Sequence, residues 1–171
     1  MVSVHVWVEG QTEETFANRV LRPHFSPIGI SLDPRLVGKG HGGIGEYSRD
    51  RGDILTTLRQ DDNTVCTTMF DYYGMPASWP QREAARQLPF LQRPVVIEQA
   101  ILADIASELG SGFNAARFIP YVQMHEFEAL LFSAPKLLAE GLDLADDSET
   151  RRIRDQFQSP EEINDSKQAA P

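Results

Sequence analysis

Acidic residues follow the ends of several segments that have the pattern of β-strands. Glu9 comes directly after the alternating valines at the start of the chain, and Asp71 ends a short apolar run. Glu126 and Glu128 lie just beyond a later strand-like segment. In an open α/β sheet, functional groups collect at the carboxyl ends of the strands, so we expect these acids to meet at one edge of the sheet.

Such a group of carboxylates predicts a site for a divalent cation. Glu13 lies one helical turn beyond Glu9 and is expected to join the same edge. Like charges at close range raise one another's pKa, and Mg²⁺ or Mn²⁺ bound by carboxylate oxygens would relieve the repulsion. A cation held there would polarise a phosphoryl oxygen and activate water. The structural alternative is that Glu13 complements a helix dipole and Glu128 is a solvated residue in the first turn of a helix.

Candidate phosphate contacts come from a glycine-rich segment and from histidine. Residues 38–43 (GKGHGG) could bring Lys39 and backbone amides to a phosphate, although they lack the closing Lys-Ser/Thr of a Walker A loop, and a flexible turn is the alternative. His125, next to Glu126, is the other basic group expected to face the site.

Nucleophile-based mechanisms find little support in the sequence. No Gly-x-Ser-x-Gly elbow is present, and Asp71 lacks the second aspartate, two positions on, that phosphoaspartate enzymes carry. The single cysteine, Cys66, lies in an apolar run and is expected to be a buried, inert thiol.

The elements that must position these residues alternate between strands and helices. Strands are predicted over 2–8, 28–37, 65–70 and 118–122, and helices follow from Thr12, around Leu55 and over 97–109. This alternation predicts an α/β domain with a mainly parallel sheet flanked by helices.

The predicted α/β domain covers residues 1–135. Within it, residues 72–94 combine four prolines with Tyr72, Tyr73, Trp79 and Phe90, which indicates an ordered excursion. Residues 136–171 form a helical C-terminal extension that is expected to be truncated or partly disordered.

Composition narrows the classes of function further. The chain has 171 residues and a net charge of −9, which argues against nucleic-acid binding through a broad basic surface but not against a metal site. No apolar stretch approaches the ~18 residues of a membrane span, and no signal peptide is evident, so a cytoplasmic protein without membrane contact is expected.

Three motifs resemble known families. Residues 8–14 (VEGQTEE) are similar to the opening motif of Toprim domains, particularly those of overcoming-lysogenization-defect (OLD) nucleases. Residues 69–76 (MFDYYGMP) and 118–132 (FIPYVQMHEFEALLF) more closely resemble the bacterial domain of unknown function 4276 family. The Toprim likeness implies a mainly parallel sheet of about four strands and phosphodiester chemistry that depends on a divalent metal.

Carried over by residue, the resemblance makes Glu9 the Toprim glutamate, Glu13 the second acid of the OLD-type opening, and Asp71 the first aspartate of the Asp-x-Asp motif. The sequence departs from that motif at Tyr73, which occupies the second aspartate position. Glu126 or Glu128 could substitute for the missing carboxylate.

The resemblance implies a Mg²⁺- or Mn²⁺-dependent nuclease, acting on nucleic acid as the effector of a bacterial antiphage defence system together with an ATPase encoded nearby. Glu9, Asp71, Glu126, Lys39 and His125 would be its catalytic residues. The alternative is a non-catalytic Toprim-like module that docks on the ATPase and regulates it. The sequence leaves open whether the chain forms a homo-oligomer.

Overall fold

The computed structural model describes residues 2–38, 42–124 and 127–163. The chain divides into two compact units, Met1–Val122 and Gln123–Pro171. The predicted domain boundary at residue 135 stays a prediction, because compactness alone does not define a folding domain. Each unit is described by itself below.

The first unit is built on a parallel sheet. Its strands are β1 (Val2–Val8), β2 (Ile30–Leu36), β3 (Val65–Asp71) and β4 (Phe118–Ile119), in the spatial order β2-β1-β3-β4. All three pairings along this order are parallel, and the short β5 (Val122–Gln123) also pairs with β3. The predicted α/β fold with a mainly parallel sheet is therefore confirmed.

The strand register brings three carboxyl ends to the same level. Val8, the last residue of β1, is aligned with Leu36 in β2 and with Met69 in β3. The chain then leaves β1 at Glu9, while β3 continues to Asp71. Parallel pairing thus places Glu9 and Asp71 at the same edge of the sheet, as expected from the sequence.

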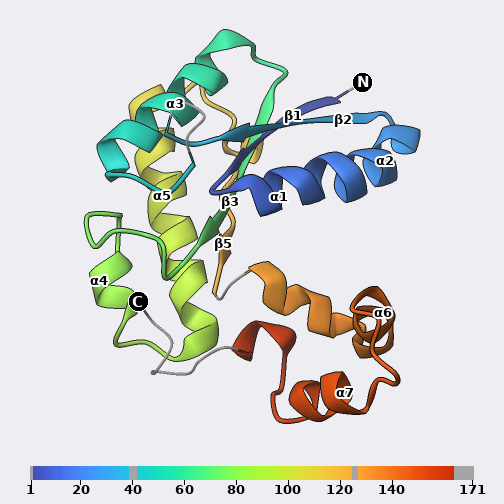
Figure 1. The fold of residues 1–171 in the computed structure, drawn as a ribbon. Coiled ribbons are helices and arrows are strands. Elements are labelled where there is room, and N and C mark those ends of the chain that lie inside the picture. The colour runs from blue at the N-terminus through green and yellow to red at the C-terminus, as the bar shows by residue number, and fades with distance from the viewer. Residues whose placement is uncertain (1, 39–41, 125–126, 164–171) are drawn as a thin grey trace. The chain divides into compact units, whose positions relative to one another are not determined.

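Helices connect successive strands (Figure 1). The connection from β1 to β2 contains α1 (Gln11–Phe16), the π-helical turn η1 (Ala17–Leu21), α2 (Arg22–Phe25) and η2 (Ser26–Ile28). The later connections contain α3 (Tyr47–Gln60), α4 (Arg82–Ala85), η3 (Phe90–Gln92), α5 (Arg93–Leu109) and η4 (Ala115–Arg117). Because β1 lies between β2 and β3, right-handed crossovers put α1 and α3 on opposite faces of the sheet.

Side chains of β1 point alternately to the two faces of the sheet and contribute to the core on each face. Val6 and Val8 pack with Leu32 of β2, and this cluster also contacts Leu21 and Phe25 from the helical connection between the two strands. The predicted period of two in the valines is the cause, since alternate side chains of a strand point to the same face.

Cys66 and α5 contribute further buried residues. Cys66 is fully buried, and desolvation raises the pKa of its thiol to about 12, which confirms the expectation of an inert cysteine. In α5, Ile97, Ile101 and Ile105 recur at four-residue spacing and are fully buried.

The proline-rich excursion is ordered through Trp79. Its indole is buried and its Nε1 donates a hydrogen bond to the Gly45 carbonyl oxygen at 2.9 Å. Edge-to-face contacts join it to Tyr47 and Phe70, with ring centroids 5.0 and 5.5 Å away. The tryptophan therefore ties the segment after β3 to the segment that follows β2.

The second unit consists of short helices. They are η5 (Phe127–Ser133), α6 (Pro135–Gly141), α7 (Ser148–Arg154) and η6 (Pro160–Glu162). The Thr150 hydroxyl of α7 donates to the Pro135 carbonyl at the start of α6 at 2.9 Å. Among the helices of the described residues, none combines the length and apolar character required to cross a membrane.

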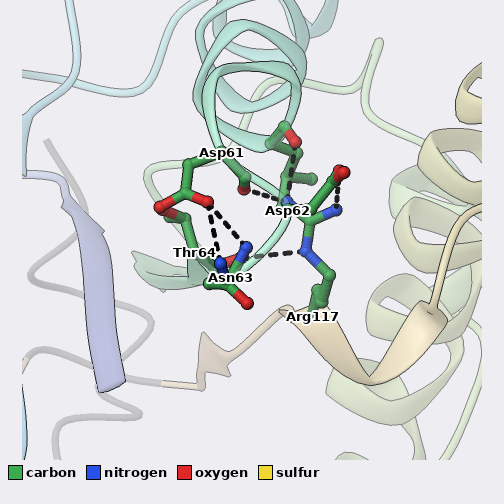
Figure 2. Close-up of polar contacts among 6 residues, drawn as sticks. Asp61, Asp62, Asn63, Thr64 and Arg117 are labelled. Atoms are coloured by element: carbon green, nitrogen blue, oxygen red, sulfur yellow. Dashed lines mark hydrogen bonds and ion pairs between the residues drawn. The ribbon is translucent and has the colours of Figure 1, made fainter. Parts of the chain in front are cut away.

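Arg117 holds the carboxyl end of α3 (Figure 2). Its Nη2 donates to the carbonyl oxygens of Leu58 and Asp61 at 2.8 and 2.5 Å, and its Nε donates to that of Thr64 at 3.1 Å. An ion pair with Asp62 adds a contact at 3.3 Å. Because the last carbonyls of a helix have no partner within it, one guanidinium satisfies groups that would otherwise need water.

We predict that Arg117→Ala lowers the free energy of unfolding by about 2–3 kcal/mol, because several charge-assisted hydrogen bonds are lost together. Urea denaturation followed by circular dichroism measures the change. Arg86→Ala is the matched control, because Arg86 is exposed and its one ion pair among the described residues is with the exposed Glu83. It should change stability by no more than ~0.5 kcal/mol. Equal effects of the two substitutions would contradict the role assigned to Arg117.

Candidate functional site at the carboxyl edge of the sheet

Glu9 and Asp71 lie side by side at the carboxyl edge of the sheet. The Asp71 backbone N–H donates a hydrogen bond to Oε2 of Glu9 at 3.2 Å. Both residues are half-buried, so the carboxylate of Glu9 is held by the protein and remains in reach of solvent. The structure therefore brings together the two acids that the sequence placed after β1 and at the end of β3.

Gly74 makes room for the Glu9 carboxylate. A Cβ at position 74 would lie 2.6 Å from Oε1 of Glu9 and 3.0 Å from its Oε2. These distances are too short for a real contact, so any larger residue would displace the carboxylate. The glycine in the MFDYYGMP motif thus has a steric reason that involves the candidate site directly.

Glu13 serves as the cap of α1. Its Oε2 accepts a hydrogen bond from the Gly10 backbone N–H at 2.9 Å, and its side chain is buried. This is the reciprocal bond of a capping box, the half that a glycine N-cap can make. The structural alternative considered for Glu13 accounts for its position, while its role as a metal ligand stays a prediction.

The glycine-rich loop after β2 is bound to the main chain of Glu9. The Gly43 N–H donates to the Glu9 carbonyl oxygen at 2.8 Å, and a Cβ on Gly42 would come within 3.0 Å of the same oxygen. Gly42 and Gly43 have φ values of 76° and 80°, which side chains disfavour. Gly42 and Gly43, at the end of the segment that was expected to approach a phosphate, therefore lie beside the end of β1.

Arg49 and Asp50, in the first turn of α3, complete this loop and were missed by the sequence analysis. The Asp50 carboxylate is buried and accepts hydrogen bonds from the Gly45 N–H at 2.8 Å and from Arg49 Nε at 2.7 Å. The Arg49 Nη2 donates to the Gly43 carbonyl at 3.1 Å. The hydrogen bond to Asp50 raises the pKa of the Arg49 guanidinium, which is therefore charged at any physiological pH.

The signal that could have identified Arg49 is its place in the chain. An Arg-Asp pair opens a helix directly after a glycine-rich loop, and the loop follows a strand. Spacing alone does not show whether such an arginine turns back onto the loop or out to solvent, so the tertiary structure was needed.

The loops after β2 and β3 are joined to each other. Besides the bond from Trp79 to Gly45, the Ser78 hydroxyl donates to Oε2 of Glu46 at 2.6 Å. Tyr73 is exposed and packs edge-to-face on the buried Tyr72. Trp79 and Tyr72 are therefore buried aromatic residues of the predicted ordered excursion, while Tyr73 is exposed.

Of the remaining predicted residues, the structure describes only Glu128. Lys39, His125 and Glu126 lie outside the described residues. Glu128 is exposed and belongs to the second unit. Within residues 2–38, 42–124 and 127–163, no three or more His, Cys, Asp or Glu side chains gather closely enough to hold a metal ion.

The described geometry brings the Glu9 carboxylate to the main chain of Asp71 and places one guanidinium on the adjacent loop. Two carboxylates with nearby backbone oxygens suit a hard divalent cation that keeps several waters, as Mg²⁺ does. Glu9 and Asp71 could supply part of such a shell, and a full protein shell would need further ligands.

A family model described as Domain of unknown function (DUF4276) matches residues 8–171 of the chain. The match confirms the family resemblance that the motifs at 69–76 and 118–132 indicated. No curated protein and no solved structure matches the chain.

We predict that Gly74→Ala folds but moves the Glu9 carboxylate away from Asp71, because the atoms in conflict are the far end of a flexible side chain. The Asp71 amide proton should then exchange with solvent faster, as measured by NMR hydrogen exchange. The control is Gly112→Ala, since a Cβ there meets nothing within 4 Å. Unchanged exchange at Asp71 in Gly74→Ala would count against the close packing described here.

Proposed function

We propose that this chain, which belongs to the DUF4276 family, hydrolyses phosphodiester bonds with the help of a divalent metal ion. The observation that carries the proposal is the hydrogen bond from the Asp71 N–H to the Glu9 carboxylate at the carboxyl edge of a parallel sheet. Ligands of open α/β sheets bind at this edge.

Glu9 and Asp71 would hold the cation, and the hydrogen bond from the Asp71 N–H to the Glu9 carboxylate, which makes the two residues neighbours at this edge, supports the assignment. When bound, Mg²⁺ or Mn²⁺ supplies positive charge for the phosphoryl oxygens and makes the attacking water more acidic. The protein's own contribution is to keep Glu9 in place through the Asp71 amide and the space left by Gly74. A ligand held in this way needs little reorganisation when the cation binds.

The likeness to Toprim domains of OLD nucleases supports the same assignment. In it, Glu9 and Asp71 take the positions of the first glutamate and the first aspartate. Because Tyr73 replaces the second aspartate, we propose Glu126 or Glu128 as the substitute, with Lys39 and His125 meeting the scissile phosphate or the leaving group. Glu13 would contribute only through the oxygen that does not bind Gly10.

We further propose that the substrate is nucleic acid and that an ATPase encoded nearby is the partner in a defence system. An acidic chain of net charge −9 has little general attraction for a polyanion, so a partner that grips the nucleic acid fits its charge.

The test combines metal binding and cleavage. We expect wild-type protein to bind Mn²⁺ in isothermal titration calorimetry and to cleave plasmid or single-stranded DNA, with or without the partner ATPase. Glu9→Gln and Asp71→Asn should weaken Mn²⁺ binding at least about 10-fold and reduce cleavage at least as much, because direct ligands matter no less than the groups that orient them.

Glu83→Gln is the matched control, because it removes an exposed carboxylate on α4 whose one ion pair within the described residues is with Arg86. It should bind Mn²⁺ and cleave like wild type. Equal cleavage by all variants would assign the activity to a contaminant and refute the proposal.

The second candidate function is a non-catalytic module that docks on the ATPase. It is favoured by the exposed Tyr73 in place of an aspartate and by the absence, within the described residues, of a group of three metal-binding side chains. Absent Mn²⁺ binding, together with an unchanged complex between Glu9→Gln protein and the ATPase in analytical ultracentrifugation, would support this module over the nuclease.

A further inference from the structure

We propose that Arg49 is the residue that binds the nucleic-acid backbone, by gripping a phosphate beside the Glu9–Asp71 pair. The inference rests on the proposed function, since it names the ligand class of the same sheet edge. It concerns a residue that neither the motifs nor the metal hypothesis involves.

A single residue, Gly43, links Arg49 to Glu9 through hydrogen bonds. The Gly43 N–H donates to the Glu9 carbonyl, and the Gly43 carbonyl accepts from Nη2 of Arg49. Two short hydrogen bonds therefore connect the guanidinium to the end of β1. A Cβ on Gly38 would lie 3.6 and 3.7 Å from the two Nη atoms of Arg49, so the side chain extends across the loop after β2.

Hydrogen bonds to Asp50 and Gly43 orient the Arg49 guanidinium and leave some of its N–H donors available. Nε binds the buried Asp50 and Nη2 binds Gly43, while Nη1 makes no hydrogen bond with any of the described residues. An arginine has five N–H donors in a rigid fork, so at least three remain for an incoming group. The side chain is 44% exposed, and a phosphate could reach those donors from solvent.

Gly45 shows that this position of Arg49 is built into the loop. A Cβ at position 45 would lie 2.1 Å from Cζ of Arg49 and 2.2 Å from its Nη2. The guanidinium thus occupies the space that a side chain at 45 would fill. A side chain at position 45 would therefore displace the guanidinium from this place.

The planar, forked guanidinium of Arg49 indicates the class of ligand that it would bind. A guanidinium binds phosphate oxygens bidentately, and backbone contacts of this kind position a nucleic acid without reading its sequence. The ligand class is therefore a phosphodiester backbone, held at the loop after β2 while the reacting phosphate meets the carboxylates.

The test measures binding without metal, so it does not depend on cleavage. A fluorescein-labelled single-stranded oligonucleotide is titrated with protein in EDTA at low salt, and fluorescence anisotropy gives Kd. Arg49→Gln should weaken binding about tenfold, the loss of one charge-assisted contact, and should reduce the slope of log K against log salt by about 0.7. Arg49→Lys keeps the positive charge but loses the forked guanidinium, so its Kd should fall between those of wild type and Arg49→Gln.

Arg59→Gln is the matched control. Arg59 lies on the same helix, is 54% exposed and contacts one carboxylate, that of Glu108, so the substitution removes the same charge about 15 Å away. It should leave Kd within about twofold of wild type. Gly45→Ala gives a second test, because it displaces Arg49 without removing its charge and should weaken binding as Arg49→Gln does, with an unchanged melting curve showing that both variants fold.

Equal Kd values for the Arg49 and Arg59 variants, or no binding of the oligonucleotide by wild type, would overturn the inference. Cleavage that depends on Glu9 but is indifferent to Arg49 would overturn it while leaving the proposed hydrolysis intact. Binding that depends on Arg49 without any cleavage would instead refute the hydrolysis and support Arg49 as the phosphate contact.

Discussion

The geometry of the candidate site depends on the end of β1. Glu9 uses its side chain and its main chain there in different directions: the carboxylate accepts from the Asp71 amide, and the carbonyl accepts from Gly43. The first bond joins the end of β1 to β3, and the second joins it to the loop after β2. Because β1 lies between β2 and β3 in the sheet, one residue can organise both neighbours.

Glycines allow polar groups to pack closely around Glu9 and Arg49. Gly74 leaves space for the Glu9 carboxylate, Gly42 for its carbonyl, and Gly45 for the Arg49 guanidinium. Polar groups packed at such distances hold one another in position, which is the preorganisation that a binding site for a cation or a phosphate requires. The glycines after β2 and β3 are thus explained by what lies against them, in addition to the turns that they allow.

A positively charged arginine lies beside the acids at this edge of the sheet, although the chain as a whole is acidic. The net charge of −9 disfavours general attraction to nucleic acid, yet the buried Asp50 and the loop carbonyl of Gly43 hold one arginine at the edge where the acids gather. A cation bound by Glu9 and Asp71 would further reduce the local negative charge. Local placement of a few charges can therefore oppose the overall balance within a Debye length.

The sequence by itself determined the alternation of strands and helices, because the valines of β1 and the isoleucines of α5 repeat at the periods of the faces that they bury. It also identified Glu9 and Asp71, since parallel strands end at a common edge, and it predicted an ordered excursion from its aromatic residues. Only the tertiary structure decided that Glu13 caps its own helix, that Trp79 ties two loops together, and that Arg49 turns back onto a glycine loop. Those outcomes depend on contacts between residues far apart in the chain, or on which of several nearby hydrogen-bond partners a side chain binds. Neither can be read from the spacing of residues along a sequence.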